Sequence, residues 1–149
     1  SRIWELRCRS INFIGGRILI SDKFKELLAD YAVLLLKGGT HSQDSGTMSA
    51  GRAKVGQGGN STSPAATDLD VDIGAGSSAY TINAIKSDDN VVEFSLRIAG
   101  SNSDLSGKVI REAGFFDAQN NMLTRLNFDG VGPVPNTSDL EIVFIVEVE

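Results

Sequence analysis

The sequence predicts a mainly β protein, an antiparallel β-sandwich of jelly-roll type with one short helix near the N-terminus and a long Gly/Ser-rich arm. Three observations predict it. Several segments alternate apolar and polar residues, as strands with one buried face do. The 16 glycines far outnumber the 3 prolines, which is typical of a turn-rich β chain. With 149 residues, 41% of them hydrophobic, the chain is long enough to bury one core.

We therefore predict a single domain over residues 1–149, with residues 38–67 as an extended loop or arm. The N-terminal part contributes two short strands, residues 11–14 and 17–20, around the pair Gly15 and Gly16 that suits a tight hairpin turn. This part of the chain is also its most basic. A solvated strand face is the simple interpretation, and contact with an acidic partner surface is the alternative. The predicted contact residues here are Arg7, Arg9 and Arg17.

Residues 21–36 are the helix candidate of the chain. Ser21 or Asp22 can cap the helix, and Gly38 with Gly39 can end it. Apolar residues recur in between at the spacing of one helix face, namely Phe24, Leu27, Leu28, Tyr31 and Leu35. The apolar run 31–36 is equally consistent with a buried strand. We predict a short helix followed by a strand.

Residues 38–59 form the first part of the arm and are rich in glycine, serine and threonine. A polar loop of about twenty residues is unusual inside a compact domain, and such loops are generally functional or ordered against a neighbour. We predict that this segment contacts another subunit, with His41, Met48 and Arg52 as interface residues.

The rest of the chain predicts a series of strands separated by polar turns, among them residues 68–73, 80–86, 90–98, 110–117, 122–128 and 139–149. The last strand is apolar on both faces, because Val143 and Ile145 alternate with its core side. A strand of this kind is normally covered on both sides. In a chain this small, the second cover is expected to be another subunit, so Val143 and Ile145 are predicted interface residues.

Charge and reactive residues exclude several classes of function. A net charge of -5 argues against nucleic-acid binding, which needs a basic patch. One histidine, His41, and one cysteine, Cys8, cannot form the usual four-ligand zinc sets or an intrachain disulfide. A Ser-His-Asp triad would have to use His41, and a structural or solvent-exposed role for this loop histidine is favoured over that of a general base. No apolar run reaches the ~20 residues of a membrane span. We expect no enzyme activity, no cofactor, no nucleic acid and no membrane partner.

The sharpest acidic cluster is Asp68, Asp70 and Asp72. On a strand these carboxylates share one face about 6–7 Å apart, too far for all three to hold one ion without a bend. A solvated strand face is favoured, and a calcium site between strands or subunits is the alternative.

Two segments of the sequence resemble small virion proteins of tailed bacteriophages. The first is Val-Gly-Gln-Gly-Gly-Asn-Ser-Thr-Ser-Pro-Ala-Ala-Thr-Asp-Leu-Asp over residues 55–70. The second is Ile-Arg-Glu-Ala-Gly-Phe-Phe-Asp-Ala over residues 110–118, followed by Asn-Met-Leu-Thr-Arg over residues 121–125. The similarity extends over about two thirds of the chain, from Val55 to Glu149, and leaves out residues 21–47.

The resemblance implies a non-enzymatic, oligomeric β-sandwich module of head-decoration (cement), tail or fibre-attachment proteins. We therefore expect a structural virion protein that is made in the host cytoplasm, forms dimers or trimers and docks on major capsid or tail proteins. The alternative is a carbohydrate- or receptor-binding module of a phage tail fibre. That alternative needs an exposed aromatic cluster, whereas Trp4, Tyr31 and Tyr80 are scattered in the sequence.

Overall fold

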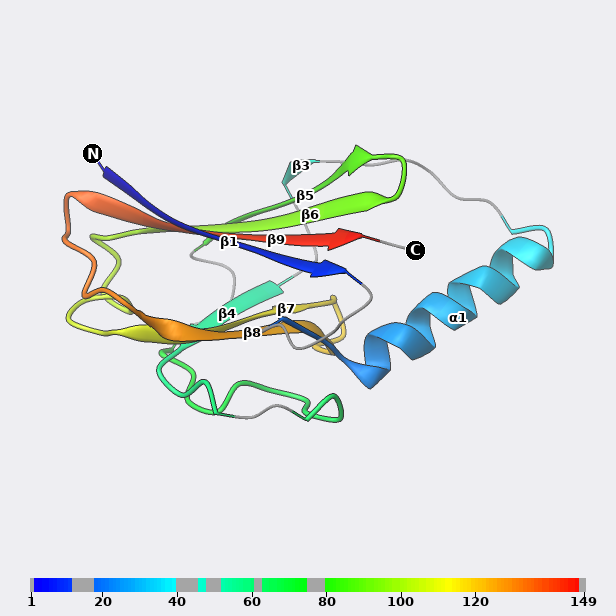
Figure 1. Cartoon of the computed structure of the whole chain (residues 1–149), viewed down its shortest axis with the longest axis horizontal. Helices are drawn as coiled ribbons and strands as arrows, with labels where there is room; N and C mark the ends of the chain where they lie inside the picture. The colour runs from blue at the N-terminus through cyan, green and yellow to red at the C-terminus, as the bar shows by residue number, and fades with distance from the viewer. Residues whose placement is uncertain are drawn as a thin grey trace.

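Two β-sheets face each other in the computed structural model (Figure 1), which describes residues 2–11, 18–39, 46–47, 52–60, 63–74 and 80–147. The five-stranded sheet has, from edge to edge, β1 (Arg2–Ile11), β9 (Ser138–Glu147), β6 (Val91–Ala99), β5 (Thr81–Asp88) and β3 (Gly46–Thr47). The four-stranded sheet has, in the same sense, β2 (Ile18–Ile20), β8 (Met122–Val131), β7 (Ile110–Phe116) and β4 (Arg52–Gly56).

Neighbouring strands in both sheets are antiparallel, except that β1 runs parallel to β9. The predicted mainly β sandwich with one short helix is thus confirmed. The jelly-roll connectivity stays a prediction.

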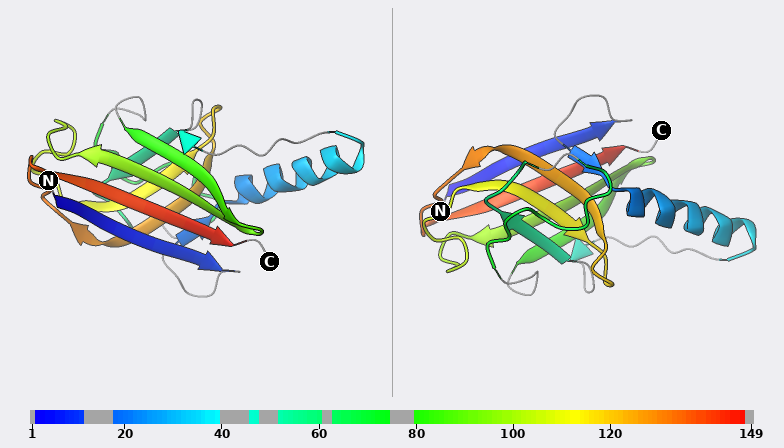
Figure 2. Two further views of the ribbon diagram at one scale, coloured as in Figure 1. Left: turned by 90° about the horizontal axis from the view of Figure 1, so that it is seen from above. Right: turned by 90° about the horizontal axis from the view of Figure 1, so that it is seen from below.

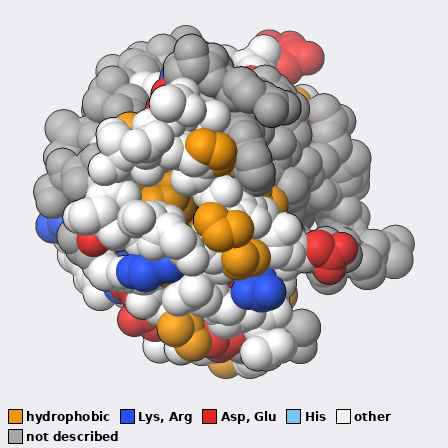
Figure 3. All heavy atoms as spheres, turned by 90° about the vertical axis from the view of Figure 1, so that its left-hand side faces the viewer, with side chains coloured by type: hydrophobic (Ala, Val, Ile, Leu, Met, Phe, Trp, Pro, Cys, Tyr) orange, Lys and Arg blue, Asp and Glu red, His pale blue; other side chains and the backbone are white. Residues whose placement is uncertain are grey.

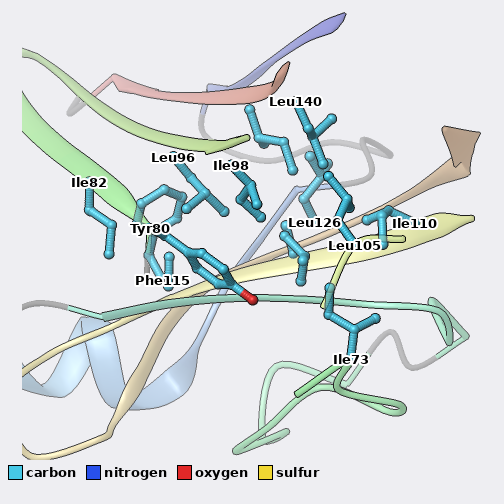
Figure 4. Packing of buried hydrophobic residues seen from close by; sticks show 14 of the residues in the cluster. Ile73, Tyr80, Ile82, Leu96, Ile98, Leu105, Ile110, Phe115, Leu126 and Leu140 are labelled. Carbon is cyan, nitrogen blue, oxygen red and sulfur yellow. The ribbon is translucent and has the colours of Figure 1, made fainter. Parts of the chain in front are cut away.

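The hydrophobic core fills the space between the two sheets (Figure 4). Phe115 of β7 lies at its centre, with its ring edge-on to Phe144 of β9 at 4.8 Å between centroids. Leu96 and Ile98 of β6 are fully buried beside them, as the alternation of residues 90–98 predicts. The alternation of residues 122–128 is confirmed in part. Leu126 and Phe128 belong to this core and Thr124 is buried, whereas Met122 packs with Leu69 and Phe116 in a separate cluster next to a register shift between β7 and β8.

Tyr80 is a core residue with a polar tip. Its side chain is 8% exposed, and its hydroxyl donates to a carboxylate oxygen of Asp104 at 3.4 Å. Burial, together with the negative charge of Asp104, raises the pKa of Tyr80 from 10.0 to about 12.

We expect Tyr80 to stay neutral until pH about 12 in the folded protein. Because the folded pKa lies above the unfolded one, the stability that this phenol contributes is complete below pH 10 and is lost as the pH rises towards 12. The pKa of Tyr80 is measured by phenolate absorbance at 295 nm in a Tyr31→Phe variant, which leaves Tyr80 as the single tyrosine. A folded-state midpoint equal to that in urea would contradict the prediction.

The helix α1 (Asp22–Leu36) is one continuous element, so the predicted strand over residues 31–36 is wrong. Ser21 caps it, with its hydroxyl accepting from the backbone N–H of Phe24 at 3.0 Å. Gly38, at φ +90°, ends it, and the N–H of Gly39 donates to the carbonyl of Leu34 at 2.9 Å. With both ends capped, the leucine-rich run continues the helix instead of entering a sheet.

Three further predictions of local structure are corrected. The predicted turn at Gly15 and Gly16 and most of the predicted strand 11–14 lie outside the described residues, but β1 and β2 on either side do not pair, because β1 belongs to the five-stranded sheet and β2 to the four-stranded one. Residues 52–56 are not part of an arm, since β4 pairs with β7 and buries Ala53 and Val55 in the core. Residues 68–73 form a covering loop with one isolated bridge, between Gly56 and Asp72.

Candidate functional site

A charged pair is buried on the four-stranded sheet. Glu112 of β7 and Arg125 of β8 are both 0% exposed, and their side chains meet at 2.8 Å. They alternate with the core residues Ala113 and Leu126, so they lie on the opposite face of the sheet. The loop residues 57–60 and 63–74 pass beneath this face (Figure 1).

The Glu112 carboxylate holds this loop by its backbone. It accepts N–H bonds from Gly58, Asp70 and Val71, each at 2.8 Å. A carboxylate that accepts several backbone N–H groups replaces the strand partner that those groups would otherwise need. This explains why residues 68–73, although their pattern alternates, do not form a strand.

Arg125, the partner of the Glu112 carboxylate, also binds the same loop. Its guanidinium donates to the backbone carbonyl of Asp68 at 2.8 Å and to the Asp70 carboxylate at 2.9 Å. It also donates to the Asn127 side chain at 3.1 Å. Guanidinium and carboxylate thus use their hydrogen-bonding groups on each other and on the loop, which suits a buried charge.

Glycines make room for this arrangement. A Cβ added to Gly56 would lie 2.2 Å from the carbonyl oxygen of Val71, and one added to Gly58 would lie 2.6 Å from the Glu112 carboxylate. The glycine-rich tract that looks like a flexible loop in the sequence therefore serves close packing.

We call this set of residues, Gly56, Gly58, Asp70, Glu112 and Arg125, the buried clamp. The Glu112 carboxylate and the Arg125 guanidinium have no exposed surface on which to meet a substrate. The chemistry of the buried clamp is therefore that of a structural tie. It joins residues 55–70 to residues 110–125, the two segments that carry the resemblance to phage virion proteins.

The three aspartates of the alternative calcium site make ion pairs and hydrogen bonds with other residues of the chain. Asp68 pairs with Lys54 at 3.2 Å, and Asp70 pairs with Arg125. Asp72 accepts the N–H of Gly74 and lies 4.0 Å from Lys54. Within the described residues, no three His, Cys, Asp or Glu side chains are placed to hold a metal ion.

The predicted interface residues lie in several places. Arg7 and Arg9 are in β1, in register with Val143 and Ile145 of β9. Val143 is only 3% exposed, so the chain itself covers it and the predicted need for a second subunit there is wrong. Ile145 is half-buried and Arg52 is exposed. Arg17, His41 and Met48 lie outside the described residues.

Among the described residues, most of the exposed large apolar side chains lie on α1, which projects away from the sandwich (Figures 1 and 2). None of its residues is buried. Its exposed large apolar side chains are Leu28, Tyr31, Val33, Leu34, Leu35 and Leu36. At the opposite end of the molecule, hydrophobic side chains form small separate groups among polar and charged ones (Figure 3). The sequence pattern places five apolar residues on one face of the helix, but residues 31–36 are all apolar, so this end of α1 is apolar on every side.

A hollow of about 260 Å³ lies at the root of α1, lined by residues of α1, of the covering loop and of the 120–122 turn. This volume is below the about 300–1,000 Å³ of most small-molecule sites. Within the described residues, no helix has the length and apolar character to cross a bilayer.

No protein-family model, no curated protein and no solved structure matches this chain. The resemblance to phage virion proteins therefore stays a prediction.

Proposed function

We propose that this chain is a non-enzymatic structural virion protein. It self-associates and docks on capsid or tail proteins of a tailed bacteriophage, as a decoration (cement) or a tail or fibre-attachment component. The observation that carries the proposal is α1, a helix that projects from a closed sandwich and presents six large apolar side chains to solvent. Exposed contiguous apolar surface of this kind is typical of protein contact sites.

The internal organisation of the chain supports the proposal. The buried clamp locks the covering loop to the sheet, and the aromatic core joins the two sheets. A subunit that must hold its shape under load in an assembly benefits from such ties. The resemblance over residues 55–149 points to the same class of protein.

The positions of the two tyrosines do not support the receptor-binding alternative. Tyr80 is buried in the core, whereas Tyr31 is exposed on α1. The two therefore do not form a joint aromatic surface. An aromatic platform is the feature that a carbohydrate site would need, so we retain the structural role.

The proposal is tested on virus particles. Particles from a culture that naturally makes this chain are banded on a caesium chloride gradient, and their proteins are quantified by mass spectrometry. We expect this chain to band with the particles at a constant ratio to the major capsid protein. A soluble host enzyme measured in the same fractions controls for trapped material. Recovery only in the soluble fraction, like the host enzyme, would overturn the proposal.

A further inference from the structure

The last six residues of α1, residues 31–36, are all apolar, so this end of the helix is apolar around its whole circumference. Leu28, Tyr31 and Leu35 form one stripe at helical spacing, while Val33 and Leu36 lie on another side. Leu36 is 87% exposed, and the other exposed apolar residues of α1 are 39–48% exposed. A single flat partner surface covers one side of a helix, so this one needs neighbours on more than one side.

The charges of α1 are confined to its first nine residues. Asp22, Glu26 and Asp30 are acidic, and Lys23 and Lys25 are basic. This mixture nearly cancels and favours neither a strongly acidic nor a strongly basic partner. It does suit another copy of the same helix, because Lys25 and Glu26 of adjacent copies lie at the same level when the helices run parallel.

The area also favours several copies. The six exposed apolar side chains present about 500 Å² per chain. Two helices side by side would each keep about half of this area exposed, and the about 500 Å² that they bury together is far below the ~1,200–2,000 Å² of a stable interface. In a bundle of three, each helix touches two others and can bury most of its own exposed apolar area, which is about twice as much per chain as in a pair. Closed threefold symmetry then makes the helices parallel.

We propose that α1 is the self-association element of this protein and packs against α1 of other copies in a parallel bundle of at least three. Because α1 projects beyond one end of the sandwich (Figure 2), such a bundle would lie at that end of the molecule. This inference deepens the proposed function, because it rests on the self-association part of it and names the partner surface.

Multi-angle light scattering on the full-length chain tests the bundle. We expect at least three times the chain mass for the wild type, and the mass of one chain for the variant Leu28→Lys/Leu35→Lys. Lysine keeps helix propensity, so α1 itself should persist, as far-UV circular dichroism will show. The matched controls are Val71→Lys and Ile85→Lys, which charge exposed apolar residues outside α1 and should leave the wild-type mass unchanged.

A cross-linking experiment tests the parallel arrangement independently. In a Cys8→Ser background, Leu36→Cys places a thiol at the tip of each helix, and oxidation should give covalent dimers on a denaturing gel. Ile85→Cys in the same background should stay monomeric. In an antiparallel pair the tips would be about 20 Å apart, so the absence of a Leu36→Cys cross-link would overturn the parallel bundle.

Two results would overturn the inference as a whole. One is a wild-type protein that stays monomeric at high concentration. If this monomer also pellets with phosphatidylcholine vesicles, α1 binds a lipid surface instead of other copies, and the inference is overturned in the same way. The other is an oligomer that Leu28→Lys/Leu35→Lys leaves intact. Either result can be told apart from a failure of the proposed function. The gradient experiment on virus particles tests that function, and its outcome does not depend on the mass measured in solution.

Discussion

Replacing Arg125 with methionine is expected to lower the free energy of unfolding by about 3–5 kcal/mol. The substitution leaves the fully buried Glu112 carboxylate without its guanidinium partner, and an unpaired buried charge is strongly destabilising. The loop carbonyl of Asp68 also loses its donor. Urea unfolding followed by circular dichroism measures the effect.

Arg97→Met is the matched control for this experiment. Arg97 pairs with Asp139 at 3.0 Å but is 44% exposed, so its loss should cost about 1 kcal/mol or less. The double variant Arg125→Met/Glu112→Leu should not recover the wild-type stability, because the N–H groups of Gly58, Asp70 and Val71 then lose their acceptor. If Arg125→Met costs no more than Arg97→Met, the clamp is not what holds the loop.

Gly56→Ala is expected to cost about 3 kcal/mol, through steric displacement of the covering loop. The added methyl group would lie 2.2 Å from the carbonyl oxygen of Val71 and 2.6 Å from the Glu112 carboxylate. One side or the other has to move, which weakens the bond from the N–H of Gln57 to the Val71 carbonyl at 2.9 Å. Urea unfolding gives the magnitude.

Amide hydrogen exchange locates the damage within the molecule. Protection should fall first at Asp70 and Val71, whose N–H groups bind Glu112. Gly107→Ala serves as the control, because its φ is +68° and no atom lies within 4 Å of an added Cβ. It should cost about 1 kcal/mol from backbone strain alone. Equal losses for the two variants would mean that close packing at Gly56 is unimportant.

The buried clamp joins the two segments on which the predicted resemblance to phage virion proteins rests. The residues that carry the resemblance include Gly56, Gly58, Asp70, Glu112 and Arg125, which meet in one hydrogen-bonded centre. What such a pattern encodes directly is a way of tying a loop to a sheet. Function must be argued separately, from surfaces such as α1 that lie outside the pattern.

The sequence by itself determined the mainly β class, the core-facing sides of β6 and β8, and the start of the helix. These features depend on local alternation and on capping side chains, which act over a few residues. It also identified the turn at residues 117–121, where the Asp117 side chain accepts from the backbone N–H groups of Gln119 and Asn121.

Only the tertiary structure decided which elements meet. Residues 68–73 alternate like a strand, but their N–H groups bind Glu112, which is about forty residues away in the chain. Val143 looks like a surface for a second subunit, yet the chain buries it. The apolar stripe of α1 looks like a core face, yet it points to solvent. Periodicity reports that a face is apolar, whereas the element that covers this face is set by contacts between residues far apart in the sequence.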